Sequence, residues 1–345
     1  MAAARVTMSQ DGFETSSDGA VVIGVDAGNS KTDLVVAGLD GSLVAYVRGP
    51  GTNAHRRGAD GSVDDIGRLV SQASFDAPAR HGVFFLCGVD IPEDVEAVSA
   101  AVARTGWVRG STVDNDSFAL LRAGSDAPDV VAVVCGAGIN CVGRAADGRI
   151  ARYPSLGWET GDWGGAVVIG REALFHGARA EDGRGPASVL PELLRDHFGL
   201  SVAELGEAIR YGRCSEGRLG EVAPAVVAAA AGGDAVARML IERLAEEVVL
   251  MATRALADLG LEEADVVLGG GMLRGGSGLL FDEVVARLQR RAPLARPVAA
   301  SQPPVVGSTL VALEAVCAPA TAAQALRAAF HDGLRPAEAG AAPSP

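Results

Sequence analysis

Lysine, asparagine and aromatic residues are scarce in this sequence. Of the 30 basic residues only Lys31 is a lysine, and asparagine occurs only at positions 29, 53, 115 and 140. Aromatic side chains make up 4% of the 345 residues. A coding bias that favours arginine over lysine accounts for the scarcity, so the positions where lysine and asparagine persist become candidates for a functional site.

Cysteine motifs and long apolar runs are also missing. The five cysteines form no CxxC pair and no zinc-ligand spacing, which predicts reduced thiols in a cytosolic protein. The five histidines show no HExxH or related spacing, so we expect no transition-metal site. The first residues lack the pattern of a signal peptide, and no apolar run approaches the roughly 18 residues of a membrane span. These absences predict a cytoplasmic protein without a membrane partner.

Positive charge is in deficit. The 30 Lys and Arg residues face 43 Asp and Glu residues, which leaves a net charge of −13, and the chain has no polybasic run. This balance disfavours nucleic acid and anionic membranes as partners. The 45 glycines have no three-residue period, which excludes a collagen helix. At roughly 100 to 200 residues per domain, the length predicts about two domains.

One supersecondary pattern occurs twice along the chain. The segment AVVIGVDAGNSKT, residues 20–32, predicts an apolar strand that ends in a glycine turn, and two further β-rich runs follow, joined by Asp40-Gly41. The same order returns in residues 130–153, where VVAVVCGAGIN precedes a second turn at Asp147-Gly148. Two copies of one unit predict a duplicated architecture.

Strands and helices alternate over the rest of the chain. We expect helices near residues 60–74, from Pro92 and after Asp234, where Asp234 is a good N-cap. The alternation predicts two α/β domains, each a mixed sheet flanked by helices, with the ligand site in the cleft between them.

The predicted domain boundaries follow from these elements. We place an N-terminal domain at residues 21–120 and a C-terminal domain at residues 121–305. A C-terminal helix, expected at residues 306–333, is a candidate to complete the N-terminal domain. Residues 1–20 are polar and small, and residues 334–345 are rich in alanine and proline, so both are predicted to be disordered tails.

The strongest local signal is GVDAGNSKT at residues 24–32. An acidic residue ends a strand, and the backbone N–H groups of the turn that follows can converge on phosphate oxygens, helped by Ser30, Lys31 and Thr32. Asp26 is suited to hold Mg²⁺ through water, because Mg²⁺ keeps several waters and takes one or two carboxylates. The alternative is a plain hairpin with a solvated lysine. The motif is not a Walker A loop, since a strand follows it instead of a helix.

Two further glycine turns follow buried strands. In CGAGIN, residues 135–140, Gly136 and Gly138 would let the backbone approach phosphate from the opposite side. In LGGGM, residues 268–272, a bare backbone would admit a flat adenine or a ribose. Each of the two, taken alone, is equally well explained as an ordinary turn.

Asp114 and Asp116 flank Asn115 where a predicted strand meets a predicted helix. A carboxylate at such a place can accept the proton of an attacking hydroxyl, and phosphoryl transfer needs one base of this kind. The alternative is that the aspartates cap the helix, and we expect at least one of them to do so.

The run LGWETGDWGG, residues 156–165, combines two tryptophans, two acids and several glycines, and we expect it to be non-helical. Aromatic faces beside carboxylates are typical of sugar sites, because a sugar ring presents apolar CH patches and hydroxyl groups. The alternative is a tryptophan-anchored loop that fills the core between the domains. Asn53 in GPGTNAH is a further polar candidate, or else an ordinary loop residue.

The ordered series GVDAGNSKT, GTN, NDSFALLRAG, CGAGIN, GDWGG, LGGGM and PPVVGSTLVALEA resembles the N-acetylglucosamine kinase and BadF/BadG/BcrA/BcrD ATPase family over roughly residues 21–320. The resemblance implies an α/β actin-like ATPase fold, in which two RNase H-like domains surround a cleft for nucleotide and substrate. It also implies a homodimeric kinase that uses ATP and Mg²⁺ to phosphorylate a hexose hydroxyl, the 6-OH of N-acetylglucosamine or of a related amino sugar.

The resemblance assigns a role to each matching position. It favours Asp116 over Asp114 as the catalytic base. The phosphate and adenosine contacts fall on Gly28, Asn29, Ser30, Lys31, Thr32, Gly136, Ala137, Gly138, Gly269, Gly270, Gly271 and Met272. The sugar contacts fall on Asn53, Asp116, Asn140, Gly157, Trp158 and Asp162.

Two departures from the family pattern bear on the substrate. GAGIN stands where amino-sugar kinases commonly have GTGSN, and GDWGG stands where they have GDEGS. Hydroxyl groups are therefore lost at Ala137, Ile139 and Gly165, and a carboxylate is lost at Trp163. Two other hypotheses stay open. One is an ATPase that activates a radical dehydratase through an iron–sulfur cluster on Cys135 or Cys141, and the other is a non-catalytic sugar sensor.

Overall fold

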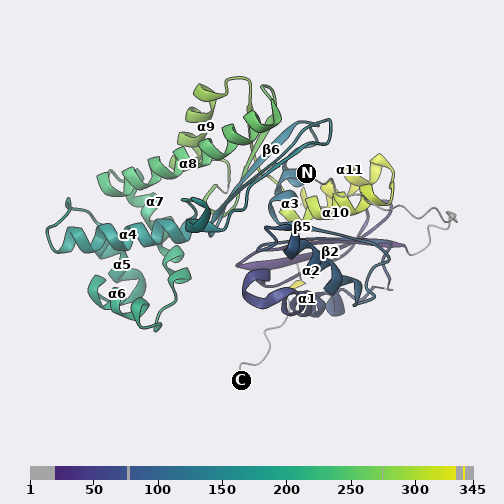
Figure 1. The fold of residues 1–345 in the computed structure, drawn as a ribbon, viewed down its shortest axis with the longest axis horizontal. Helices are drawn as coiled ribbons and strands as arrows, with labels where there is room; N and C mark the ends of the chain where they lie inside the picture. The colour runs from purple at the N-terminus through teal and green to yellow at the C-terminus, as the bar shows by residue number, and fades with distance from the viewer. Residues whose placement is uncertain (1–19, 76–77, 274, 332–336, 339–345) are drawn as a thin grey trace.

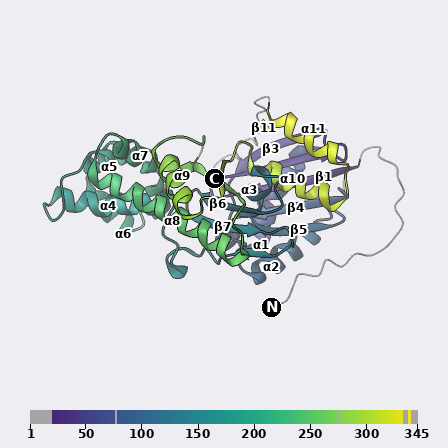
Figure 2. The same ribbon diagram turned by 90° about the horizontal axis from the view of Figure 1, so that it is seen from above.

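The computed structural model describes residues 20–75, 78–273, 275–331 and 337–338. Two perpendicular views show two lobes side by side, one around the first sheet and one that carries most of the helices from the middle of the chain (Figures 1 and 2). The predicted tails lie outside the described residues, apart from residue 20 and two residues near the C-terminus.

The first sheet has six strands in the order β11-β3-β2-β1-β4-β5. The strands are β1 Val21–Ala27, β2 Lys31–Gly38, β3 Leu43–Pro50, β4 His81–Leu86, β5 Ser111–Asn115 and β11 Ala337–Glu338. β1, β2 and β3 form the antiparallel meander predicted from Asp40-Gly41, and β4 and β5 run parallel to β1. Strand β11 corrects the prediction of a wholly disordered tail. It pairs with β3, whose edge would otherwise present unpaired N–H and C=O groups.

The second sheet repeats the topology of the first. Its strands are β6 Val130–Cys135, β7 Ile139–Arg144, β8 Ile150–Arg152, β9 Asp265–Gly269 and β10 Arg296–Ala299. The order β8-β7-β6-β9-β10 matches β3-β2-β1-β4-β5, with an antiparallel meander followed by two parallel strands in both sheets. The predicted duplication is therefore confirmed.

Helices cover both faces of the first sheet (Figure 1). They are α1 Ala54–Ala73 and α2 Pro92–Ala103 on one face, and α3 Ser117–Gly124, α10 Pro304–Ala315 and α11 Ala320–His331 on the other. Side chains alternate along β1, so Ile23 packs with α1 and α2 whereas Val22 packs with α10 and α11. A Cβ at Gly24 would overlap the backbone of Thr309, and glycine there lets α10 lie directly on β1.

The C-terminal segment returns to the first lobe as two helices, not as the single helix predicted at residues 306–333. Cys317 has a φ of 54° and Pro319 follows it, so the helix cannot continue through this point. Arg327 of α11 donates to the carbonyl oxygens of Arg122 and Ala123 at the end of α3, at 3.2 and 2.8 Å. These bonds attach the last helix to the middle of the chain.

The second lobe carries the helices α4 Ala166–Glu181, α5 Leu190–Phe198, α6 Val202–Arg210, α7 Ala223–Ala231, α8 Ala235–Leu259 and α9 Leu279–Arg291. Helix α8 begins after Asp234, which accepts from the Ala237 N–H, and ends at Gly260 with a φ of 65°, as its sequence predicts. It packs on one face of the second sheet, and α3 packs on the other through Leu120 and Leu121. Helix α3 is therefore shared by the two lobes.

Two helical starts differ from the predictions. Helix α1 begins before residue 60, because the Asn53 side chain accepts from the N–H groups of His55 and Arg56 at 2.9 and 3.3 Å and caps it. Gly58 has a φ of 69° inside this helix and breaks its pattern. The run 156–165, predicted to be non-helical, contains a 3₁₀ turn at Gly157–Thr160.

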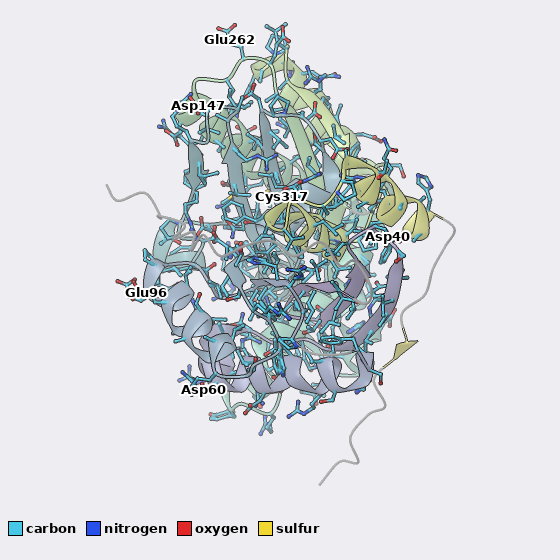
Figure 3. All side chains as sticks on the ribbon, turned by 90° about the vertical axis from the view of Figure 1, so that its right-hand side faces the viewer. Asp40, Asp60, Glu96, Asp147, Glu262 and Cys317 are labelled. Atoms are coloured by element: carbon cyan, nitrogen blue, oxygen red, sulfur yellow. The ribbon has the colours of Figure 1, made fainter. Side chains whose placement is uncertain are left out.

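Exposed acidic side chains lie around the outside of both lobes. Figure 3 shows Asp60, Glu96, Asp147 and Glu262 at the periphery of the molecule. Among the described helices, none alone is long and apolar enough to cross a bilayer. Residues 216–231 and 235–259 reach that length and hydropathy only as a pair bent by 110°.

Candidate active site

The first glycine turn joins β1 to β2. Gly28 donates its N–H to the Lys31 carbonyl at 2.9 Å and closes the turn, while Asn29 and Ser30 are exposed at its tip. The Thr32 hydroxyl is buried and has no hydrogen-bond partner among the described residues. An exposed backbone tip with an unpaired hydroxyl at its base fits a ligand that carries several acceptor oxygens.

Asp26, at the end of β1, is a buried carboxylate without a direct cationic partner. It lies opposite Asp33 on β2, which lies opposite Arg48 on β3, so the three side chains share one face of the sheet. Asp33 is held by Lys31 and, at 2.6 Å, by Arg48, whereas no described side chain donates to Asp26. Burial and the nearby charge of Asp116 raise the pKa of Asp26 to about 8. Such a carboxylate fits a divalent cation.

The cation would be only partly held by protein. Within the described residues, no three acidic, histidine or cysteine side chains converge as a direct ligand set. One buried carboxylate and a largely intact water shell are typical of Mg²⁺.

Asp116 lies at the start of α3, where the two lobes meet. Asp116 occupies the N-cap position of this helix, but its side chain makes no cap bond. The Asn115 side chain accepts from the Ser117 N–H at 2.9 Å instead. Asp114 is held by Arg152 at 3.0 Å. No described side chain pairs with the carboxylate of Asp116, and burial followed by the charge of Asp90 raises its pKa to about 7.

The four asparagines form two bonded pairs beside these aspartates. Asn53 donates to Asn29 at 3.0 Å in the first lobe, and Asn140 donates to Asn115 at 3.0 Å across the lobe boundary. Asn140 also accepts from the Ser155 hydroxyl at 2.6 Å. Each of the four scarce asparagines is therefore hydrogen-bonded to another one, and Asn140 is also engaged with Ser155.

Two residues of this region, Cys87 and Asp90, were not predicted from the sequence. The Cys87 thiol accepts from the side-chain amides of Asn29 and Asn53 at 3.0 and 3.3 Å and so links the first turn to the start of α1. Asp90 accepts from the Asn115 amide at 2.7 Å and lies 3.4 Å from His55. Their only sequence signal was a position just after the buried strand β4, where functional side chains of α/β sheets gather.

The second glycine turn is braced by helix α4. The N–H groups of Ala166 and Val167 donate to the carbonyl oxygens of Gly136 and Ala137 at 2.8 and 3.1 Å. A Cβ at Gly165, whose φ is 85°, would overlap the Gly138 backbone. The turn is therefore fixed to the start of a helix, while Cβ atoms at Gly136 and Gly138 would meet nothing within 4 Å. That open space is what a close backbone approach to a ligand requires.

A groove of about 620 Å³ opens next to the second turn. It brings Ala137 and Gly138 together with three of the predicted sugar contacts, Gly157, Trp158 and Asp162. Asp162 closes its own loop by accepting from the Gly157 N–H at 3.2 Å and from the Thr160 hydroxyl. The two tryptophans differ in their surroundings. Trp163 is buried in the core of the second lobe, as a tryptophan that anchors a loop would be, whereas Trp158 is 83% exposed and is accessible to a ligand.

The third glycine cluster ends β9 beside the second turn. Gly270 has a φ of 92°, and a Cβ there would overlap the backbone of Cys135 at the end of β6. At Gly271 a Cβ would meet nothing within 4 Å, and Met272 packs at the edge of the core. The segment thus combines one glycine that the packing requires with one that leaves open backbone.

Comparison with protein families and curated proteins gives one consistent answer. The model of the BadF/BadG/BcrA/BcrD ATPase family matches residues 23–312. The chain is 24% identical over 304 residues to the N-acetylmuramic acid/N-acetylglucosamine kinase of Clostridium acetobutylicum, covering 84% of this chain and 97% of that protein. It is 24% identical over 313 residues to the N-acetyl-D-glucosamine kinase of Dictyostelium discoideum, with coverages of 85% and 98%.

Solved structures confirm the predicted fold. A candidate N-acetylglucosamine kinase from Chromobacterium violaceum superposes with a TM-score of 0.69 at 21% identity, over 85% of this chain and 98% of that one. A ROK family glucokinase from Streptomyces griseus, in complex with glucose and AMPPNP, superposes with a TM-score of 0.56 at 17% identity, with coverages of 85% and 98%. The chain has the two-lobed α/β fold of actin-like sugar kinases.

Proposed function

Because the chain belongs to the BadF/BadG/BcrA/BcrD ATPase family, we propose that it is a sugar kinase that transfers the γ-phosphoryl group of ATP to a hexose hydroxyl. The observation that carries the proposal is the pair Asp26 and Asp116. Asp26 is a buried carboxylate without a direct cationic partner. Asp116 lies at the junction of the lobes, and its side chain makes no cap bond to the helix that it precedes. Phosphoryl transfer requires these two functions, cation binding and proton acceptance.

The glycine turns would bind the nucleotide. The first turn, residues 28–32, and the second, residues 136–138, would donate backbone N–H groups to the phosphates, and residues 269–272 would line the adenosine. The ion pair between Lys31 and Asp33 means that Lys31 must exchange a carboxylate for a phosphate in order to contact ATP. Mg²⁺ held by Asp26 through water would neutralise charge on the phosphates.

Asp116 would act as the general base. Its carboxylate accepts the proton of the hexose 6-OH as the hydroxyl oxygen attacks the γ-phosphorus and ADP leaves. A base is most effective when its pKa is near the working pH, and the value of about 7 meets that condition. Asp114 is less suited, because its carboxylate is occupied by Arg152.

The proposed acceptor is N-acetylglucosamine or a related amino sugar. Both curated relatives act on N-acetylglucosamine by name, and Gly157, Trp158 and Asp162 lie together beside the second turn. A coupled ADP-release assay across N-acetylglucosamine, glucosamine, glucose, N-acetylmannosamine and N-acetylmuramic acid tests the proposal. We expect turnover to be highest with an N-acetylated amino sugar, and ADP release that no sugar stimulates would refute it.

Nothing in the structure favours the iron–sulfur alternative. Cys135 is fully buried and Cys141 is 1% exposed, and both pack in the core of the second lobe. Neither thiol can reach a cluster at a subunit surface without unpacking that core.

The environment of Asp116 predicts a specific pH dependence. Burial raises the pKa of Asp90 to about 6, so Asp90 is ionised where Asp116 titrates, and its charge raises the pKa of Asp116. We expect kcat/KM to rise with pH and level off above about 7. Asp90→Asn should move this inflection to lower pH, since the repelling charge is gone while an amide oxygen still accepts from Asn115.

Full pH profiles at saturating ATP and Mg²⁺ measure this effect. Asp94→Asn is the matched control, because Asp94 also lies 3.4 Å from His55 but is not a cause of the Asp116 shift. An inflection that stays in place in Asp90→Asn would show that Asp116 is not the titrating base.

A further inference from the structure

The groove beside the second turn extends well beyond the predicted sugar contacts. It starts at Ala137 and Gly138 and follows helix α4 from Val167 to Phe175. The eight steps between these two residues, at a rise of 1.5 Å each, make this wall roughly 12 Å long. A volume of about 620 Å³ lies in the middle of the roughly 300 to 1,000 Å³ that pockets for drug-sized ligands occupy. A single pyranose ring cannot contact both ends.

The wall that α4 forms ends in Phe175, an aromatic side chain that solvent can reach. Trp158 is 83% exposed and Phe175 is 56% exposed, and both face the groove. Exposed aromatic side chains that line the same groove are typical of recognition sites, whereas single ones scattered over a surface are common. Since the chain contains only 15 residues of the three aromatic types (9 Phe, 3 Trp and 3 Tyr), two exposed ones in a single groove are a notable concentration.

Charge selects the class of ligand. Asp162, Glu172 and Arg171 are the charged residues that line the groove, so its own balance is one negative charge. Arg171 is already 3.6 Å from Glu216. The Trp163 indole N–H donates to Glu172 at 3.1 Å and thereby holds this carboxylate at the wall. An anionic group would meet two carboxylates here, whereas a neutral polyhydroxylated ring would find hydroxyl acceptors beside aromatic faces.

We propose that this groove is a second sugar subsite, which binds a neutral sugar ring linked to the hexose that is phosphorylated. The substrate class is then an amino-sugar disaccharide or a longer glycan, with the first ring at Asp116 and Trp158 and the next ring on the Phe175 face. The inference rests on the proposed kinase function for the identity of the first ring. The evidence for the groove is its lining residues, which do not depend on the proposed reaction.

The test compares one sugar with its dimer. The probes are N-acetylglucosamine and N,N′-diacetylchitobiose, measured by calorimetry without ATP and by ADP release with ATP and Mg²⁺. We expect the affinity for the dimer to be about three- to tenfold higher than the affinity for the monomer, because one additional aromatic contact contributes a factor of this size. Phe175→Ala should remove that preference and Phe175→Tyr should keep it. Tyr211→Ala, which deletes a 69% exposed aromatic side chain outside the groove, should also keep it.

The outcomes separate the two proposals. Equal binding of monomer and dimer by the wild-type protein, or a Phe175→Ala effect that is the same for both sugars, would overturn the second subsite while sugar-dependent ADP release still supports the kinase. Preferential dimer binding without turnover of either sugar would support the subsite and overturn the kinase proposal.

Discussion

Replacing Asp116 by asparagine will lower kcat by about 10²- to 10⁴-fold, the usual contribution of a positioned general base. Sugar affinity should change little, because an amide oxygen still accepts a hydrogen bond from the acceptor hydroxyl. The structure adds a reason to expect a folded variant, since the Asp116 side chain caps no helix. Steady-state ADP release and calorimetric sugar binding together measure the two effects.

Asp114→Asn is the matched control for this experiment. It makes the same chemical change two residues away, on a carboxylate that pairs with Arg152 at 3.0 Å. We expect it to keep most of the turnover. If Asp114→Asn is inactive while Asp116→Asn retains wild-type kcat, the roles of the two aspartates are reversed.

Asp26→Asn should make the protein more stable and inactive at once. In the folded state, burial and then the charge of Asp116 raise the pKa of Asp26 from its ordinary value of 3.8 to about 8. The unfolded state therefore ionises Asp26 more easily, and this difference destabilises the fold increasingly as the pH rises from about 4 to about 8. Since one pKa unit corresponds to about 1.4 kcal/mol, removing the charge should raise the free energy of unfolding by at least about 1 kcal/mol at pH 8.

Urea unfolding without Mg²⁺ at pH 5 and pH 8 measures this prediction. The gain should be larger at pH 8, and Mg²⁺ with ATP should stabilise the wild-type protein but not the variant. Asp33→Asn is a control that should change the free energy of unfolding in the opposite direction. It leaves Lys31 and Arg48 without their carboxylate and should therefore destabilise the protein. A lower stability of Asp26→Asn at pH 8 would contradict the assignment of Asp26 as an uncompensated charge.

Much of the fold could be predicted because local signals agreed with the tertiary arrangement. The strands β1 and β6 are continuous apolar runs that end in glycine turns, and both were recognised as copies of one unit. Helix α8 carried both an N-cap and a terminal glycine. The start of α1 was missed because its cap, Asn53, precedes a stretch interrupted by Gly58, so the periodicity became visible only further along.

The candidate site was predictable where residue type and position combined. Glycine turns and strand-end aspartates carry their chemistry in the local sequence, as Asp26 and Asp116 illustrate. Cys87 and Asp90 were not predictable, because their importance depends on partners 58 and 25 residues away, Asn29 and Asn115. The capping role of Asn115 likewise could not be separated from that of its neighbours before the structure was known, since asparagine and aspartate are both good caps.

The return of the C-terminal helices to the first lobe has a consequence for biosynthesis. The face of the first sheet that bears Val22 and Val35 is covered by α10 and α11, which leave the ribosome after the second lobe. Until then this apolar face must remain open while the entire second lobe is synthesised and folds. The second lobe can therefore become native during translation, whereas the first lobe, which holds the turn around Lys31, can reach its native state only after α10 and α11 have been synthesised.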